Sequence, residues 1–382
     1  MRGPLLALLH GVASAGAGRV APRAARVTMS ASAPVQVTAS PEALADRVRV
    51  GTLELSALGV GALNWPLDKA DDEQTAQALA VCVRSGVDFV DTAEAYGFGR
   101  SEELVANCVK RLPPGARRVA VATKFAPVPW RMTASSLVDA CAASAVRLGV
   151  ETIDLYQIHF PDVLQPLAAL GVQQRKDELY WAGLAEAYKR GLVANVGVSN
   201  YGPALLKRAK AFFDGQGVPL ASNQINFSLL YRKQGAQATV DWCRDHGIAA
   251  LGYFPLANGL LAGKYSASNL PSGLKGMSMR KYVVGGVVER GVTFKPGGVA
   301  PLLAEMRAVA QSRGRTVAQV ALNYAMSKGV LPIPGCRNAQ MAAENAGALG
   351  WRLDGGELAA LEAASDGLGF EFAGGGFGLE EE

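Results

Sequence analysis

The fold is indicated most clearly by residues 118–160, RVAVATKFAPVPWRMTASSLVDACAASAVRLGVETIDLYQIHF. The stretch opens with an apolar run, RVAVATKF at 118–125, and closes with another, TIDLYQIHF at 152–160. Between them, residues 134–149 have the Ala and Leu content of a helix and end in Gly149, a common residue just after a helix. The stretch therefore predicts a strand, a helix and a second strand parallel to the first.

The same alternation continues along the chain from residue 47 onward. The strand candidates are residues 55–63, 86–93, 118–125, 152–160, 193–200, 221–228, 248–256 and 330–335. The helical patterns are residues 72–86, 101–112, 134–149, 179–191, 201–215, 234–247, 301–315 and 339–349. Nearly continuous apolar strands that alternate with helices are typical of a parallel sheet covered by helices. Eight such units predict an α/β fold of the closed (β/α)8 TIM-barrel type.

A doubly wound open sheet is the alternative, because a length of 382 residues permits either fold. The open sheet is disfavoured because the first predicted turn, GVGALNWP at 59–66, lacks the G-x-G-x-x-G pattern of a dinucleotide site. We expect the barrel to span residues 47–350. The Gly-rich segment 265–300 is expected to form a long surface loop over the barrel mouth, and residues 351–382 a flexible C-terminal tail.

Residues 1–41 differ in composition from the rest of the chain. They hold four arginines, no acidic residue and many Ala, Ser and Gly residues. This composition predicts an organelle transit peptide. A secretory signal is an alternative, since LLALLHGVASAGA at 5–17 resembles a short apolar core followed by small residues. A disordered tail without a targeting role is the third possibility.

Charge and cysteine usage limit the class of protein. Without the four N-terminal arginines the net charge of +5 falls to +1, which gives no reason to predict a nucleic-acid partner. After the first forty residues no uncharged apolar run is long enough to predict a membrane span. The cysteines are scattered singly, which argues for a reduced compartment and against disulfides or structural zinc. They are Cys82, Cys108, Cys141, Cys243 and Cys336.

Ionisable residues follow three consecutive predicted strands, at the end of a TIM barrel where chemistry takes place. Asp91 ends the second strand, and Tyr96 lies in the loop beyond it. Lys124 ends the third strand and His159 the fourth. A buried lysine needs a carboxylate partner, and Asp91 on the neighbouring strand is the nearest one. We expect Lys124 to lower the pKa of Tyr96 from about 10, which would make Tyr96 a general acid near neutral pH.

Each of these residues also has a purely structural interpretation. Lys124 and Asp91 could form only a structural ion pair, His159 could be a hydrogen-bonded rim residue, and Tyr96 could be a loop aromatic. Their joint placement on adjacent strand ends instead favours carbonyl reduction. In that reaction a phenol gives the proton, an imidazole polarises the carbonyl, a cofactor supplies hydride and no metal is needed.

Five motifs, taken in order, resemble the signature series of the aldo-keto reductases. They are DTAEAYG at 91–97, ATKF at 122–125, DLYQIH at 154–159, VGVSN at 196–200, and IPG at 333–335 followed by AEN at 343–345. The resemblance covers about residues 50–350. It is nearest to the plastid enzymes of plants and algae, and more distant to the potassium-channel β-subunits. It implies a TIM barrel that reduces aldehydes or ketones with NADPH in the chloroplast stroma, with mitochondrial matrix and cytoplasm as alternatives.

The resemblance also implies residue roles. Tyr96 would be the proton donor, Asp91 and Lys124 would tune it, and His159 would orient the carbonyl. The cofactor residues would be Ser199, Asn200 and Gln224 for the nicotinamide carboxamide, Tyr253 for stacking on its ring, Leu256 and Lys264 for the pyrophosphate, and Gly335, Arg337, Glu344 and Asn345 for the adenosine end. Arg337 would pair with a 2′-phosphate and favour NADPH over NADH. Trp65, Trp130 and Phe160 would line an apolar pocket for the small carbonyl substrate.

The chain departs from the family pattern at the adenosine end. Gly335-Cys336 stands where many relatives have Lys-Ser, and Met341 where many have Arg. An NADPH-binding, redox-sensing subunit with slow turnover is the alternative function. Aldehydes from lipid peroxidation, quinones and pyridoxal all remain candidate substrates, and the sequence predicts no oligomeric state.

Overall fold

The computed structural model describes residues 38–66, 72–162, 176–289 and 292–372. Within them, eight parallel strands lie side by side in the order β12-β9-β8-β7-β6-β5-β4-β3. The strands are β3 (Val60–Gly61), β4 (Phe89–Asp91), β5 (Ala120–Phe125), β6 (Leu155–Ile158), β7 (Val196–Ser199), β8 (Leu220–Asn226), β9 (Ala249–Tyr253) and β12 (Val330–Pro332). Gly59 N donates to Pro332 O and Gly61 N to Pro334 O, each at 2.9 Å, which joins the first strand to the last. The predicted TIM barrel is confirmed.

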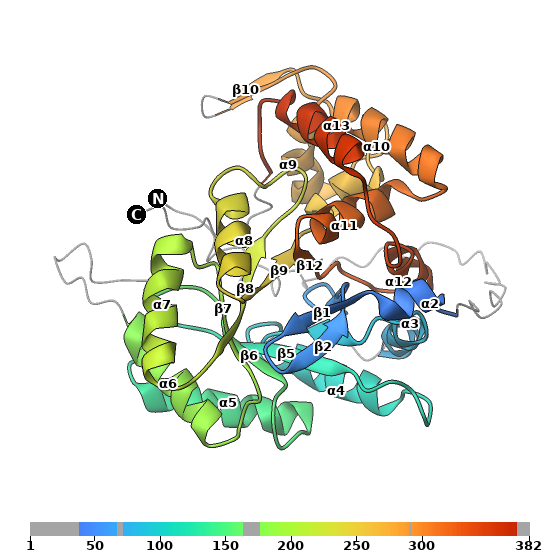
Figure 1. Ribbon diagram of the computed structural model, residues 1–382. Coiled ribbons are helices and arrows are strands. Elements are labelled where there is room, and N and C mark those ends of the chain that lie inside the picture. The colour runs from blue at the N-terminus through green and yellow to red at the C-terminus, as the bar shows by residue number, and fades with distance from the viewer. Residues whose placement is uncertain (1–37, 67–71, 163–175, 290–291, 373–382) are drawn as a thin grey trace, which may run out of the picture.

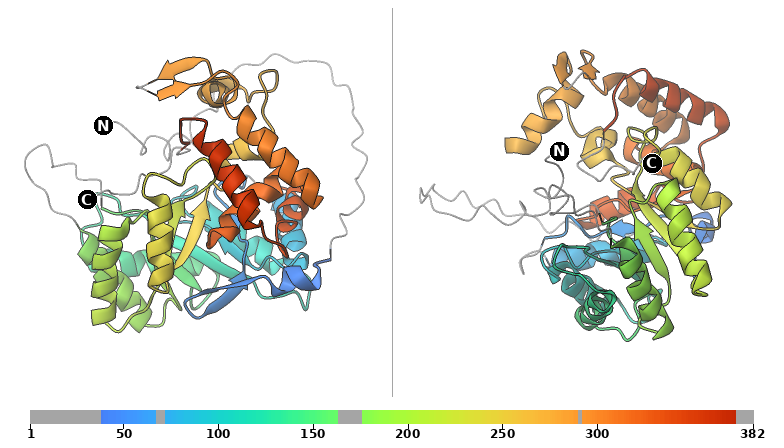
Figure 2. Two further views of the ribbon diagram at one scale, coloured as in Figure 1. Left: turned by 45° about the horizontal axis from the view of Figure 1, so that its top comes forward. Right: turned by 90° about the vertical axis from the view of Figure 1, so that its left-hand side faces the viewer.

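Helices cover the outside of this curled sheet (Figures 1 and 2). Those that alternate with the strands are α3 (Asp72–Arg84), α4 (Arg100–Lys110), α5 (Ala134–Leu148), α6 (Asp177–Lys189), α7 (Pro203–Gly215), α8 (Ala236–Asp245), α11 (Val317–Ser327) and α12 (Ala339–Ala346). Local chemistry sets their ends. Thr133 accepts a hydrogen bond from Ser136 N at the start of α5. Gly149, where the sequence predicted the end of the helix, follows α5 in the left-handed conformation.

A short hairpin closes the N-terminal end of the barrel. It consists of β1 (Arg47–Val50) and β2 (Leu53–Ser56) and follows the small helix α2 (Pro41–Ala45). Val50 and Leu55 of the hairpin are buried in the same apolar cluster as Phe89 and Leu251 inside the barrel. The hairpin was not predicted, because its second strand runs into the apolar residues of β3 without a polar break.

Residues 265–300, predicted as a long surface loop, contain regular secondary structure. The segment contains helix α9 (Gly273–Val283) and the hairpin of β10 (Val287–Glu289) and β11 (Val292–Phe294). Tyr282 of α9 packs edge-on against Phe294 of β11, at 5.3 Å between ring centroids, and its ring also contacts Phe370 and Phe372 near the C-terminus. Burial of these aromatic rings stabilises a structure that the high Gly content of the segment concealed.

The prediction of a flexible tail from residue 351 is wrong for the part that the structure describes. Helix α13 (Gly355–Asp366) begins with a reciprocal capping box between Asp354 and Glu357, and packs against α10 (Ala300–Arg313). Beyond it, the Glu371 carboxylate accepts a 2.7 Å hydrogen bond from Lys233 N, and Phe372 N donates to Leu230 O at 2.8 Å. The C-terminal segment is thus fixed to the loop after β8.

Helix α11 is another element that the sequence did not predict. Its residues Val320 to Met326 are all buried, including Asn323 and Tyr324. A helix surrounded by protein lacks the polar stripe that produces a helical period in a sequence. Its capping box, Thr316 with Gln319, was the remaining signal.

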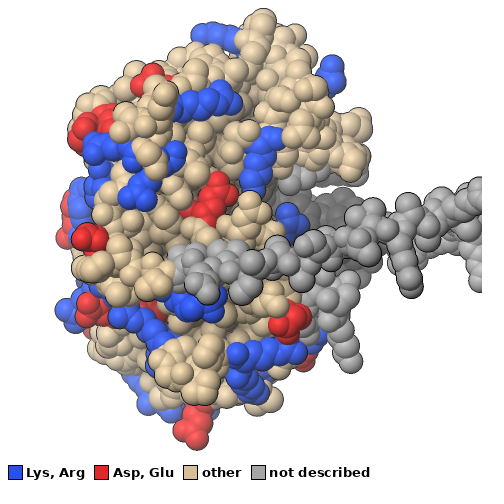
Figure 3. Space-filling view, turned by 90° about the vertical axis from the view of Figure 1, so that its right-hand side faces the viewer, with Lys and Arg blue, Asp and Glu red and all other residues tan. Residues whose placement is uncertain are grey.

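The predicted transit peptide falls mainly on residues 1–37, which lie outside the described residues. Among the residues that are described, no helix is both long and apolar enough to cross a bilayer. Basic and acidic side chains are interspersed on the face shown in Figure 3.

Candidate active site

A buried ion pair lies at the C-terminal ends of β4 and β5. Lys124 Nζ is 2.5 Å from Asp91 Oδ2 and also donates to Thr92 O at 2.7 Å. The side chain of Lys124 is completely buried and that of Asp91 nearly so. Burial alone would lower the pKa of Lys124, but Asp91 and Tyr96 raise it by more, so its pKa lies above the usual value. The lysine is therefore a fixed cation.

Two glutamines hold the other oxygen of Asp91. Gln224 Nε2 donates to Asp91 Oδ1 at 2.7 Å, and Gln157 Nε2 donates at 3.3 Å. Gln224 was predicted as a cofactor ligand, whereas Gln157 was missed. The signal for Gln157 was its position two residues before His159, since alternate residues of a strand point to the same side. Its backbone is also in register with Lys124.

The phenol of Tyr96 lies beside this pair, in the loop after β4. Its hydroxyl is 3.5 Å from Lys124 Nζ, and its ring is 5.6 Å from that of His159, at 74°. The predicted fall in its pKa is wrong. Loss of water around the hydroxyl raises the pKa of Tyr96, Lys124 opposes this, and Asp91 adds to the rise. At neutral pH Tyr96 is thus a phenol with a proton to give.

His159 stands at the end of β6 as a neutral imidazole. Burial, and secondarily the charge of Lys124, place its pKa well below the usual 6.5. Its side chain is buried, yet Nδ1 has no hydrogen-bond partner among the described residues. A buried polar atom left without a partner costs free energy, so its retention points to a ligand that is bound during function.

A second ion pair, which was not predicted from the sequence, fixes the loop that carries Tyr96. Arg131, after β5, contacts both carboxylate oxygens of Glu94, and the Nη2–Oε2 distance is 3.0 Å. Glu94 Oε1 also accepts a 2.7 Å hydrogen bond from Ala126 N. Glu94 lies between Asp91 and Tyr96 in the chain, so this bidentate pair ties the tyrosine loop to the lysine strand.

Four of the predicted cofactor residues form one hydrogen-bonded cluster beside the buried ion pair. Tyr253 OH donates to Asn200 Oδ1 at 2.7 Å, and Asn200 Nδ2 donates to Ser199 Oγ at 3.1 Å. Ser199 Oγ in turn donates to the backbone oxygen of Gln224 at 2.8 Å. Asn200 Nδ2 also donates to His159 O at 3.0 Å, which connects the cluster to the catalytic candidates.

The loop after β9 has an unusual backbone. Phe254, Ala257 and Asn258 all have positive φ angles, between 45° and 55°. Such angles are costly for residues other than glycine and gather at ligand-binding loops. Leu256 lies within this loop and is partly buried, while Lys264 follows the short 3-10 helix η3 (Ala257–Ala262) and is exposed.

The residues predicted for the adenosine end lie around the start of α12. Asn338 caps the helix by accepting a 2.8 Å hydrogen bond from Met341 N. Arg337, just before this cap, is exposed, and Glu344 is partly exposed on the helix. Asn345 Nδ2 donates to Gly335 O at 3.4 Å. A helix N-terminus beside an arginine is suited to a phosphate group.

The three aromatic residues predicted for the substrate pocket differ in burial. Trp65 and Phe160 are buried, and the rings of Phe160 and His159 are 5.6 Å apart. The indole nitrogen of Trp65, like Nδ1 of His159, has no partner among the described residues. Trp130 is 78% exposed, so it is not part of a closed pocket wall in this structure.

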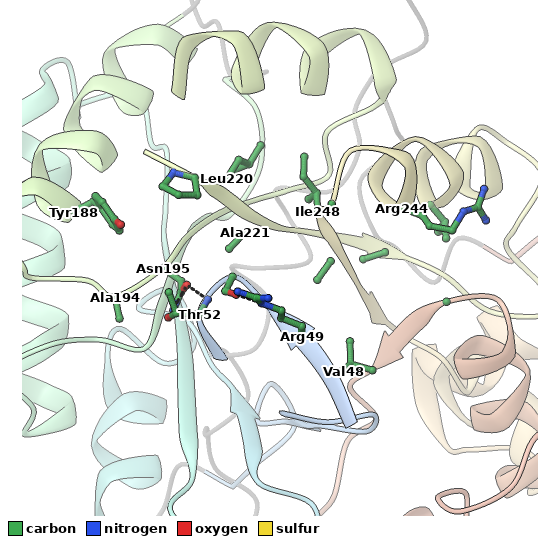
Figure 4. Close-up of a pocket in the computed structure, with 17 residues that line it drawn as sticks. Val48, Arg49, Thr52, Tyr188, Ala194, Asn195, Leu220, Ala221, Arg244 and Ile248 are labelled. Atoms are coloured by element: carbon green, nitrogen blue, oxygen red, sulfur yellow. Dashed lines mark hydrogen bonds between the residues drawn. The ribbon is translucent and has the colours of Figure 1, made fainter. Parts of the chain in front are cut away.

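A cavity of about 650 Å³ lies at the opposite, N-terminal end of the barrel (Figure 4). It is lined by the β1–β2 hairpin and by residues at the starts of β7, β8 and β9, including Asn195 and Leu220. None of the predicted site residues lines it. Among the described residues no cluster of His, Cys, Asp and Glu could hold a metal ion.

Comparison with known proteins identifies the family of this chain. A sequence profile described as the Aldo/keto reductase family matches residues 57–366. The chain belongs to the aldo/keto reductase family. The resemblance inferred from the motifs is confirmed, and with it the assignment as an oxidoreductase.

Among curated relatives, a chloroplastic pyridoxal reductase of Arabidopsis thaliana is 36% identical over 84% of this chain and 86% of its own length. A probable aldo-keto reductase of Glycine max is 27% identical over 81% of this chain and 86% of its own. Among solved structures, a glycerol dehydrogenase from Gluconobacter oxydans matches with a TM-score of 0.69 at 22% identity, over 85% of this chain and 96% of its own. An aldo-keto reductase of Bombyx mori in complex with NADP matches with a TM-score of 0.62 at 21% identity, over 86% and 94%.

Proposed function

We propose that this chain reduces aldehydes or ketones to alcohols, with hydride from NADPH and a proton from Tyr96. The observation that carries the proposal is the arrangement around Lys124. A buried cation holds one carboxylate and lies 3.5 Å from a phenol that keeps its proton. A neutral imidazole, whose Nδ1 has no partner among the described residues, lies edge-on to that phenol ring, at 5.6 Å between ring centroids.

NADPH fits the residues that surround this group. The cluster of Ser199, Asn200 and Tyr253 offers amide and hydroxyl groups for a carboxamide and an aromatic face for the nicotinamide ring. The strained loop at 254–258 supplies backbone groups for the pyrophosphate. Arg337 and the start of α12 provide positive charge for a 2′-phosphate.

The chain's own residues then perform the acid chemistry. When bound, NADPH supplies hydride to the carbonyl carbon. Tyr96 gives its phenolic proton to the carbonyl oxygen, and the cation of Lys124 stabilises the phenolate that remains. Asp91 keeps Lys124 charged and in place. His159, being neutral, donates a hydrogen bond to the same carbonyl oxygen and fixes its orientation.

Pyridoxal is the first substrate to test, because the Arabidopsis relative bears the name pyridoxal reductase. The buried rings of Trp65 and Phe160 would pack against its aromatic ring.

The same Arabidopsis relative is named as chloroplastic, which supports a plastid location for this chain, directed by residues 1–41. A fluorescent fusion of those residues tests the location, and signal outside plastids would contradict it.

The experiment is NADPH consumption by the purified protein with pyridoxal, methylglyoxal and 4-nitrobenzaldehyde, with the alcohol product identified by mass spectrometry. We expect turnover of at least one aldehyde. The variant Arg337→Ala should weaken NADPH binding by about tenfold or more and leave NADH binding unchanged. NADPH binding without reduction of any aldehyde would contradict the proposal and favour the redox-sensing alternative.

A further inference from the structure

Two of the five cysteines, far apart in the sequence, meet in the structure. Cys82 lies in the last turns of α3, and Cys336 lies in the loop between β12 and α12. Their sulfur atoms are 3.9 Å apart, and both side chains are buried. All five cysteines are free thiols, so this pair is a reduced dithiol. The cysteines are scattered singly along the sequence, and the fold brings these two into contact.

The loop of Cys336 belongs to the proposed NADPH site. Cys336 stands between Gly335 and Arg337, and Gly335 O accepts the hydrogen bond from Asn345. The same loop closes the barrel, since Pro334 O accepts from Gly61 N. On the other side, α3 packs along α12 (Figure 1). A bond between the two sulfurs would therefore join the cofactor loop directly to a barrel helix.

We propose that Cys82 and Cys336 form a redox-sensitive pair whose oxidation to a disulfide displaces the cofactor loop and weakens NADPH binding. The second half of this inference rests on the proposed function. A disulfide requires the sulfurs to approach to about 2.05 Å. Because α3 is a packed helix, the loop carrying Cys336 moves toward Cys82 and draws Arg337 with it.

The oxidant is a peroxide, and the chemistry balances with hydrogen peroxide. Cys336 gives up its thiol proton and its sulfur attacks one peroxide oxygen, which breaks the O–O bond, gives a sulfenic acid and releases hydroxide. The hydroxide takes up the thiol proton and leaves as water. The Cys82 sulfur then attacks the Cys336 sulfur and expels its oxygen as water. In total two thiols and one peroxide give one disulfide and two waters, and a dithiol reductant reverses the change.

The two cysteines have different roles in this order of steps. Contact with Cys336 and burial raise the pKa of Cys82 well above its usual value, so Cys82 remains a thiol. Cys336 is also buried, but it lies in a loop next to the exposed Arg337, whereas Cys82 lies within a helix. Cys336 is therefore the sulfur that meets the peroxide, and Cys82 is the sulfur that resolves the sulfenic acid.

The test treats the full-length reduced protein with hydrogen peroxide and then measures intact mass, disulfide-linked peptides and the Kd for NADPH. The variants are Cys82→Ser and Cys336→Ser, with Cys243→Ser as the matched control, because Cys243 is also buried but lies in α8. We expect wild type and the control to lose two hydrogen atoms through a Cys82–Cys336 bridge that dithiothreitol reverses. The Kd for NADPH should rise about tenfold on oxidation, from loss of the Arg337 contact.

A wild type that keeps all its thiols, or one that forms another linkage, would overturn the redox pair. A bridge that forms without any change in Kd would overturn its coupling to the cofactor loop. If the reduced protein does not bind NADPH at all, the proposed function fails, whereas the peptide mapping still decides whether the pair is oxidised.

Discussion

Buried polar groups at the two ends of the barrel differ in their charge and in their hydrogen bonding. At the N-terminal end, both the oxygen and the nitrogen of the Asn195 amide have hydrogen-bond partners. Its oxygen accepts from Thr52 N at 2.8 Å (Figure 4). Its nitrogen donates to Thr52 Oγ1 and to Asp154 O, each at 3.0 Å. At the C-terminal end a lysine cation is completely buried, and a histidine nitrogen lacks a partner among the described residues.

The difference shows what marks a functional site in this molecule. The cavity of about 650 Å³ lies beside Asn195, whose side-chain oxygen and nitrogen both have hydrogen-bond partners. The opposite end combines buried charge, an unpartnered imidazole nitrogen and several positive φ angles. These costs are tolerated where a ligand offsets them.

Lys124→Met should have the largest effect. It leaves the Asp91 carboxylate buried without its cation, which costs about 3–5 kcal/mol of folding stability. Turnover should fall by about 10³-fold or more, because Tyr96 loses the charge that stabilises its phenolate. Denaturant unfolding and kcat measure the two effects. The double variant Lys124→Met with Asp91→Asn should recover part of the stability but not the turnover. If Lys124→Met has the same free energy of unfolding as wild type, Lys124 and Asp91 do not form a buried ion pair.

His159→Gln should reduce kcat by about 10²-fold, since one donor to the carbonyl oxygen is lost. NADPH affinity should change little, because Asn200 Nδ2 donates to the backbone oxygen of residue 159, which the variant keeps. Steady-state kinetics with the best substrate of the panel separates kcat from cofactor binding. Equal turnover in variant and wild type would exclude His159 from the reaction.

The depressed pKa of His159 also predicts how stability depends on pH. In the unfolded chain this histidine titrates near pH 6.5, whereas in the folded protein it stays neutral to lower pH. Below about pH 6.5 the unfolded state therefore binds one proton that the folded state does not. Protonation of this histidine then lowers the free energy of unfolding by up to about 1.4 kcal/mol per pH unit. Above that pH the contribution vanishes. The free energies of unfolding of wild type and His159→Gln, measured between pH 8 and 5, should diverge only below about pH 6.5. A constant difference over this range would contradict the depressed pKa of His159.

Asn195→Ala should have the smallest effect on catalysis. Removal of the amide leaves Thr52 N and Asp154 O without their side-chain partner, at a cost of about 1–3 kcal/mol in stability. kcat and KM should match wild type, because Asn195 lies at the end of the barrel opposite Tyr96 and Lys124. A large fall in turnover at unchanged stability would mean that the two ends are coupled.

The sequence predicted the strand ends well because each strand is an apolar run with an abrupt polar end, and Asp91, Lys124 and His159 stand at such ends. It missed what depends on contacts between distant segments. The Glu94–Arg131 pair and the Cys82–Cys336 pair join residues whose separation in the sequence matches no known motif. Helix α11 has no polar face to give it a period. The predicted direction of the Tyr96 pKa shift was wrong, because burial raises this pKa by more than Lys124, 3.5 Å away, lowers it.

The role of Tyr96 as the proton donor is tested most directly by a matched pair of variants. Tyr96→Phe and Tyr188→Phe remove the same hydroxyl group at the two ends of the barrel, since Tyr188 lines the N-terminal cavity. The measurement is kcat with a saturating aldehyde, alongside the Kd for NADPH. We predict that Tyr96→Phe loses about 10²–10⁴-fold in kcat with its Kd unchanged, while Tyr188→Phe behaves as wild type. Full turnover by Tyr96→Phe would contradict the account.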